Sequence, residues 1–221
     1  MSSRTLSVAI LLSAVAAIAG AMLGGGATWL LYVGKPLTTL LVLRLAASAT
    51  PSIGGRYRVA VLAGMALSLV GDVLLMLPVD LFVPGLIAFL LAHLGYIVAF
   101  APGSSAKARA AAGGALALVA GANLAGLLPR IGADLKGPVL AYVAVLATMA
   151  AFALARAWTP AIVRAMPRSA RFAAAGGLAF VLSDSLLAWD KFGGGLPLAQ
   201  PMILATYWAA QWCIARSVAA R

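Results

Sequence analysis

Residues 57–77 read YRVAVLAGMALSLVGDVLLML, an apolar run of membrane-crossing length with one carboxylate near its end. A transmembrane helix needs about 20 mostly apolar residues, and a charge inside such a run is costly enough to mark a candidate functional site. A second run, AFVLSDSLLAW at 179–189, carries Asp184 in the same way. The chain has five acidic residues and no glutamate, and only Asp72 and Asp184 lie inside apolar runs.

The composition excludes a soluble globular protein. Hydrophobic residues make up 64% of the 221 residues and charged residues only 10%, whereas a soluble domain is about half apolar and a quarter charged. We therefore predict an all-α, polytopic membrane protein that forms one integral-membrane domain over residues 1–221. The lone Cys213 cannot form an internal disulfide, and no cysteine-based metal site is indicated.

Apolar runs of spanning length predict eight transmembrane helices, separated by short connections rich in glycine and proline. Their expected ranges are 6–24, 28–48, 57–77, 83–101, 107–128, 137–158, 170–189 and 198–217. Pro36 suggests a local break inside the second range, and Gly137-Pro138, Pro160 and Pro167 are among the residues that mark breaks between spans. The first run could also be a cleaved signal peptide with Arg4 as its basic flank, but its length favours a span.

The distribution of basic residues predicts that both ends of the chain face the cytoplasm, because cytoplasmic segments carry the excess of Lys and Arg. With that orientation, inside segments carry twelve basic residues and outside segments three. The twelve are Arg4, Arg44, Arg56, Arg58, Lys107, Arg109, Arg156, Arg164, Arg168, Arg171, Arg216 and Arg221; the three are Arg130, Lys136 and Lys191. Since these charges lie between apolar runs rather than on one face, the net charge of +11 does not indicate nucleic-acid binding.

A few polar side chains remain inside the predicted spans, and they agree in depth. At 1.5 Å per residue, Lys35 lies about 10 Å from the outer end of its span, Asp72 and Asp184 about 8 Å, and His93 and Tyr207 about 14–15 Å. The further polar residues of these spans are Thr38, Thr39, Ser68, Tyr96, Ser183 and Gln211. We expect one cavity in the outer half or at the midplane of the membrane.

Structural interpretations compete with a catalytic one. Lys35 and Asp72 could form a buried salt bridge, and one lysine cannot fully neutralise two carboxylates, so one acid should be protonated or hydrogen-bonded to His93 or a tyrosine. Thr38 and Ser68 are expected to bond to backbone groups, as such hydroxyls commonly do in membrane helices. His93 and Tyr96 could be a satisfied core pair, and Tyr207 and Gln211 could hold helices together. Asp80 and Asp134 are read as solvated loop charges.

Five segments in chain order resemble the YhhN-like lysoplasmalogenase family of eight-helix membrane proteins. They are GKPLTTLLVL (34–43), ALSLVGDVLLML (66–77), GLIAFLLAHLGYIVAF (85–100), GGLAFVLSDSLLAWDKF (176–192) and ATYWAAQW (205–212). The resemblance implies an ether hydrolase that cleaves the vinyl ether bond of lysoplasmalogens to a fatty aldehyde and glycerophosphoethanolamine or glycerophosphocholine. It carries over Lys35, Asp72, His93, Tyr96, Ser183, Asp184, Tyr207 and Gln211, with Asp190 at the outer mouth.

Vinyl ether chemistry gives the carboxylates their roles. The bond resists base and yields to acid, so the site needs one protonated carboxyl group and one anion that stabilises the cation and positions water. We expect Asp184 as acid and Asp72 as counter-anion and base, with the reverse assignment open. His93 would exchange protons, Lys35 would bind the headgroup phosphate or tune an acid, and no metal or cofactor is required.

A lipid or small-cation transporter could use the same buried Asp, Lys and His residues, although no internal repeat is visible. The expected partners are a lysophospholipid and membrane lipids, without nucleic acid and with the oligomeric state left open. The Ala- and Arg-rich, Lys-poor usage suggests a bacterial cytoplasmic membrane. A bacterial member could also act on other ether lipids or lysolipids.

Overall fold

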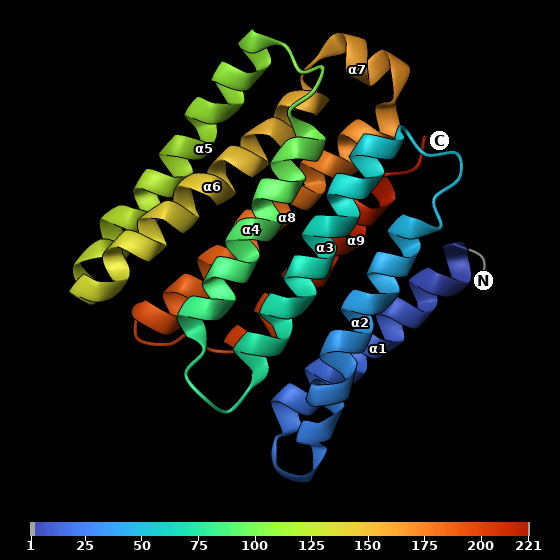
Figure 1. Cartoon of the computed structure of the whole chain (residues 1–221). Helices are drawn as coiled ribbons and strands as arrows, with labels where there is room; N and C mark the ends of the chain where they lie inside the picture. Colours follow the sequence, from blue (N-terminus) through green and yellow to red (C-terminus); the bar gives the residue numbers. More distant parts are fainter. Residues whose placement is uncertain (1–2, 221) are drawn as a thin grey trace.

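The computed structural model describes residues 3–220, which fold into a bundle of long helices packed side by side (Figure 1). Over these residues there is no β-strand, only an isolated bridge between Ser52 and Ala219. The long helices are α1 (Ser3–Leu23), α2 (Thr28–Ala47), α3 (Gly55–Met76), α4 (Phe82–Phe100), α5 (Ala106–Leu127), α6 (Ala133–Ala157), α8 (Pro167–Phe192) and α9 (Ala199–Ser217). Short 3₁₀ turns η1 (Gly25–Ala27) and η2 (Leu128–Arg130) and a short helix α7 (Pro160–Ala165) lie between them.

Seven of the helices within residues 3–220 are long and apolar enough to cross a membrane: α1 to α6 and α8. This supports an integral membrane protein. The eighth expected span, α9, is 19 residues long but is not among the seven. It carries polar side chains such as Gln200, Gln211 and Arg216, and it packs along α8 inside the bundle.

Two proline expectations were wrong. Helix α2 continues through Pro36 without a break, and α6 begins at Ala133 and contains Pro138, where a break between spans was expected. Proline removes one backbone donor and disfavours a helix interior, yet helices packed among other helices tolerate it. Pro160 and Pro167 behave as expected, because each lies at the start of a helix, where a missing N–H costs little.

Glycines let neighbouring helices approach closely around the centre of the bundle. A Cβ atom on Gly95 of α4 would lie 3.2 Å from the backbone nitrogen of Gly64 on α3. A Cβ on Gly71 would lie 2.6 Å from the ring of Phe89. Small residues at such contacts strengthen van der Waals packing between membrane helices. The close approach packs α3, which carries Asp72, directly against α4, which carries His93.

The first and last helices meet at one end of the bundle. Figure 1 shows that α1 starts and α9 ends at the end where α7 lies. The segment after α9 binds the α2–α3 connection, where Ile53 N donates to Val218 O at 3.1 Å and Ala220 N donates to Pro51 O at 2.9 Å. Arg44, Arg56, Lys107, Arg164 and most other basic residues lie on elements at this end, whereas Arg221 is outside the described residues.

Replacing Gly95 with leucine should lower the thermal unfolding midpoint in detergent, because the side chain would enter the backbone contact between α3 and α4. Overpacking of this kind costs about 1–3 kcal/mol. Gly114→Leu is the matched control, since a Cβ there meets nothing within 4 Å. Equal midpoints for the two variants would contradict the close α3–α4 contact.

Candidate active site

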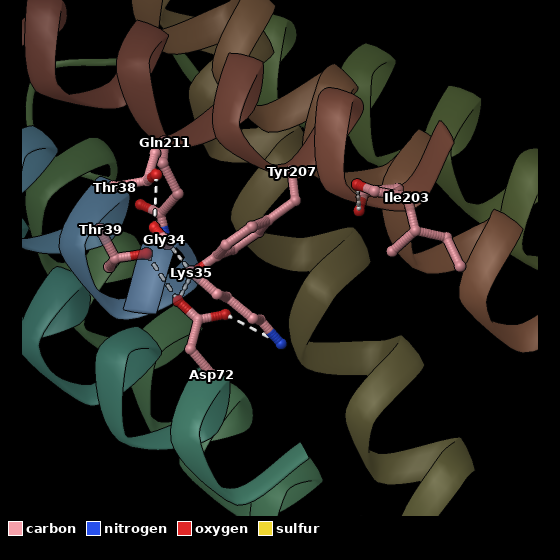
Figure 2. A network of polar contacts seen from close by, with 9 residues as sticks. Gly34, Lys35, Thr38, Thr39, Asp72, Ile203, Tyr207 and Gln211 are labelled. Atoms are coloured by element: carbon pink, nitrogen blue, oxygen red, sulfur yellow. Dashed lines mark hydrogen bonds and ion pairs between the residues drawn. The ribbon is translucent and has the colours of Figure 1, made fainter. Parts of the chain in front are cut away.

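Asp72 lies at the centre of a polar cluster that joins three helices (Figure 2). Its Oδ2 accepts hydrogen bonds from Thr39 Oγ1 of α2 at 2.6 Å and from Tyr207 OH of α9 at 2.7 Å. Lys35 Nζ lies 3.6 Å from Oδ1, within ion-pair range. The Asp72 side chain is 1% exposed and that of Lys35 12%. A buried carboxylate with a nearby cation and two hydroxyl donors is compensated for its loss of water.

The cluster continues inward from Tyr207 along a chain of side-chain amide and hydroxyl groups. Gln211 Nε2 donates to Tyr207 OH at 3.2 Å, and Tyr96 OH donates to Gln211 Oε1 at 2.8 Å. Ser68 Oγ lies 3.4 Å from Tyr96 OH. These residues are buried, so their hydrogen bonds fix the register of α3, α4 and α9 while supporting the Asp72 partner Tyr207.

Asp184 forms a second cluster with a tyrosine and a histidine. Tyr142 OH donates to Asp184 Oδ2 at 2.5 Å, and His93 Nε2 lies 3.0 Å from the same hydroxyl. His93 Nε2 is also 3.7 Å from Asp184 Oδ2. When Tyr142 donates to Asp184, its oxygen is free to accept from His93 Nε2–H. His93, Tyr142 and Asp184 therefore form a short, bent chain of hydrogen bonds along which a proton could move.

Both aspartates line one cavity of about 180 Å³, together with Lys35, Tyr142 and Tyr207. Aromatic rings pack between the two polar clusters. The Phe180 ring centroid is 4.7 Å from that of His93 and 5.6 Å from that of Tyr207. The rest of the lining is mostly apolar and comes from α4, α5, α6 and α8. The arrangement is an apolar pocket with a few convergent polar groups, which is typical of a small-molecule site.

Each carboxylate keeps one oxygen without a hydrogen bond. Asp72 Oδ1 accepts none from any residue in the described range, although Lys35 is nearby. The hydrogen bond of Asp184 within residues 3–220 falls on Oδ2, which leaves Oδ1 unbonded. Two such oxygens on one cavity could transfer a proton, hold a water molecule or face a developing positive charge.

The remaining predicted site residues make hydrogen bonds outside the two aspartate clusters. Ser183 lines the cavity but donates to Ile203 O at 3.1 Å, a link between α8 and α9. Asp190 accepts from Leu196 N at 3.0 Å and so closes the turn between α8 and α9. Thr38 donates to Gly34 O on its own helix, a backbone bond of the kind expected for it. No group of three or more His, Cys, Asp or Glu side chains in residues 3–220 is arranged to hold a metal ion.

Sequence reasoning missed Tyr142, the residue that connects Asp184 to His93. It also left Thr39 out of the site, although this hydroxyl donates to Asp72. One signal could have found Tyr142, since its place near the start of α6 gives it a depth similar to that of Asp184 near the end of α8. Thr39 is one turn from Lys35 and therefore on the same face of α2.

Comparison with known protein families shows to which family the chain belongs. The family model described as "YhhN family" matches residues 30–218, which is most of the chain and includes both aspartate clusters. The chain belongs to the YhhN family. No solved structure matches it.

Several members of the family carry a functional name. The human protein named "Lysoplasmalogenase TMEM86B" is 34% identical over 195 residues, covering 86% of this chain and 76% of its own length. A Mycobacterium bovis protein named "Lysoplasmalogenase" is 35% identical over 155 residues, covering 67% of this chain and 56% of its own length. An Escherichia coli protein named "Uncharacterized membrane protein YhhN" is 45% identical over 76 residues, covering 34% of this chain and 36% of its own length.

The ion pair in this YhhN protein can be tested by a double-mutant cycle. Lys35→Met should destabilise the protein by up to about 3 kcal/mol, because it leaves Asp72 buried without its cation. Adding Asp72→Asn should recover part of the loss, since the neutral amide needs no counter-charge. Denaturant unfolding in detergent measures each free energy. Additive effects of the two substitutions would show that the pair does not stabilise the fold.

Proposed function

We propose that the chain hydrolyses the vinyl ether bond of lysoplasmalogens, releasing a fatty aldehyde and glycerophosphoethanolamine or glycerophosphocholine. The observation that carries this proposal is the single apolar cavity lined by two aspartates, each hydrogen-bonded to a tyrosine. Membership of a family whose relatives include proteins named lysoplasmalogenase supports the same reaction.

The reaction needs one proton and one water molecule. A carboxylic acid protonates the alkene carbon remote from the ether oxygen, and the C=C electron pair forms the new C–H bond. The resulting oxocarbenium ion takes up water, and the water proton passes to a base. The protonated base then gives its proton to the glycerol oxygen, which leaves as an alcohol, while the hemiacetal hydroxyl gives up its proton to restore the acid and becomes the aldehyde carbonyl. Paired carboxyl groups divide acid and base roles in this way in glycoside hydrolysis.

Asp184 is proposed as the acid. Its Oδ2 is held by Tyr142, so a proton on the unbonded Oδ1 could be presented to the substrate. Tyr142 in turn contacts His93 Nε2 at 3.0 Å, which provides a route for replacing the proton after each turnover. This route assigns Tyr142 and His93 to proton return rather than to direct contact with the alkene.

Asp72 is proposed as the carboxylate that stabilises the cation and orients water. Lys35 at 3.6 Å and the hydroxyls of Thr39 and Tyr207 offset part of the cost of burying its charge. Its Oδ1 has no hydrogen-bond donor among the described residues and could accept one from water. Because Lys35 already pairs with Asp72, we assign Lys35 to tuning the charge of this carboxylate, ahead of binding the headgroup phosphate.

We further propose that the protein crosses a bacterial cytoplasmic membrane eight times, with both ends in the cytoplasm. Helix α9 would be the eighth span, because it lies along α8 and connects the two ends of the bundle. The aspartates would then lie in the outer half of the membrane. Lys35, Asp72 and Asp184 all lie nearer the bundle end opposite to the basic one.

Asp72→Asn and Asp184→Asn should each lower the rate of aldehyde release from lysoplasmenylethanolamine at least about 100-fold, the usual share of general acid–base catalysis. Tyr142→Phe should lower it about 10- to 100-fold, because a hydrogen bond to a charged group is worth about 1.5–3 kcal/mol. Purified variants with unchanged thermal midpoints are compared by coupled aldehyde assay. Asp134→Asn, at an exposed position in the first turn of α6, serves as the control.

Near-normal turnover by either aspartate variant would reject the two-carboxylate mechanism. Fatty acid release from an acyl lysolipid, with no aldehyde from the vinyl ether, would reject the substrate. Movement of a labelled lysolipid across proteoliposomes without its consumption would favour a transporter.

The topology can be measured by cysteine labelling, because Cys213 is the only native cysteine. In a Cys213→Ser background, single cysteines at Val79 and Pro197 should react with a membrane-impermeant maleimide in intact cells. Cysteines at Lys107 and Ala220 should react only after permeabilisation. If the cysteines at positions 197 and 220 react from the same side of the membrane, α9 does not cross it.

A further inference from the structure

The catalytic cavity is too small for the whole of the proposed substrate. Its volume is about 180 Å³, whereas pockets that enclose drug-sized ligands occupy about 300–1,000 Å³. A lysolipid combines a zwitterionic headgroup with a long hydrocarbon chain. If the vinyl ether lies between Asp72 and Asp184, part of the chain must extend beyond the cavity.

A second hollow lies on the outer face of α5 and α6, the pair at one edge of the bundle in Figure 1. It is an open groove of about 640 Å³. Small and apolar side chains line nearly all of it, with Arg109 and Thr148 as the polar members. From Gly113 to Leu124 the groove follows α5 for about 16 Å, which is close to half of the ~30 Å hydrocarbon core of a bilayer.

The cavity and the groove share one thin wall. Ala120 and Leu124 of α5 and Val143 and Ala147 of α6 line both of them. All four side chains are partly exposed, and two of them are only methyl groups. A small change in the separation of α5 and α6 at this wall would therefore join the cavity to the groove.

Helix α5 is the least embedded of the seven apolar helices in the described residues. Only 17% of its apolar window is buried, against 33–44% for the others. It packs mainly on α6 and lightly on α8. On the α8 side it is fastened by Trp189, whose Nε1 donates to Asn123 Oδ1 at 2.9 Å. At the shared wall α5 meets α6 through apolar side chains alone, so no side-chain hydrogen bond has to break there for the wall to open.

We infer that the hydrocarbon chain of the substrate passes between α5 and α6, across the wall of Ala120, Leu124, Val143 and Ala147, into the outer groove. This inference rests on the proposed function. The polar side of the cavity, with Lys35 and Asp72, receives the headgroup side of the lipid, and the apolar α5–α6 side receives the chain. The chain then stays in apolar surroundings, in the groove and the bilayer, while the vinyl ether lies between the two aspartates.

A bulky side chain in the wall should therefore discriminate against long chains. Ala120→Trp and Ala147→Trp are expected to lower kcat/KM for a hexadecenyl lysoplasmalogen at least about 10-fold more than for a hexenyl analogue. Leu118→Trp is the control, because Leu118 is 77% exposed and lines neither hollow. Equal losses on both substrates, or no loss on either, would overturn the inference.

A second measurement separates this inference from the function itself. A non-hydrolysable alkyl lysolipid with a diazirine at the end of its chain should label residues 113–124 and 140–152 of the wild type. Ala120→Trp should abolish that labelling, and labelling elsewhere would overturn the route. If the groove is labelled but the protein releases no aldehyde, the vinyl ether reaction is rejected and the chain route stands. If aldehyde is released but the groove is not labelled, the chain route is rejected and the reaction stands.

Discussion

Two carboxylates inside an apolar bundle have to find polar partners, and this constraint organises the structure. Asp72 of α3 takes its partners from α2 and α9, and Asp184 of α8 takes its partners from α6 and α4. Each acid thus fastens three helices in register. Removing the partners of Asp72 would leave a buried carboxylate uncompensated, and removing those of Asp184 would leave a carboxyl group without its hydrogen bond; either change costs more than losing an ordinary apolar contact.

The helices outside these two sets behave differently. Helix α1 carries neither aspartate nor a partner of one, and it is joined to α2 by the Thr38–Ser13 hydrogen bond at 2.9 Å. Helix α5 also stands outside and is the least embedded apolar helix of residues 3–220. The helices joined by polar side chains therefore surround the carboxylates, and the least buried apolar helix, α5, borders the groove. This division suits a site that must hold its acids still and admit a long chain.

Aromatic packing keeps the two carboxylates chemically distinct. Phe180 packs between His93 and Tyr207, and Phe89 packs against both Phe180 and Tyr207. Asp72 faces the ammonium group of Lys35, whereas Asp184 faces the Tyr142 hydroxyl and His93. The two carboxyl groups thus have different neighbours on opposite sides of the Phe180 and Phe89 rings. That difference would let one of them be protonated while the other is charged.

The sequence predicted the helices to within a few residues, because an apolar run of spanning length has one stable form in a membrane. It also offered a Lys35–Asp72 ion pair as one alternative, and the structure has the two groups 3.6 Å apart. It could not reveal Tyr142 as the partner of Asp184, because pairing between α6 and α8 depends on helix packing. The break expected at Pro36 failed for the same reason, because neighbouring helices stabilise α2 around it.

Infrared spectroscopy of the carboxyl groups tests the central claim most directly, because the chain contains only five acidic side chains and no glutamate. In ester-free detergent at neutral pH, the wild type should show one protonated carboxyl C=O band. That band should disappear in Asp184→Asn and persist in Asp72→Asn. The absence of any such band, or its loss in Asp72→Asn alone, would contradict the assignment of Asp184 as the acid and Asp72 as the carboxylate.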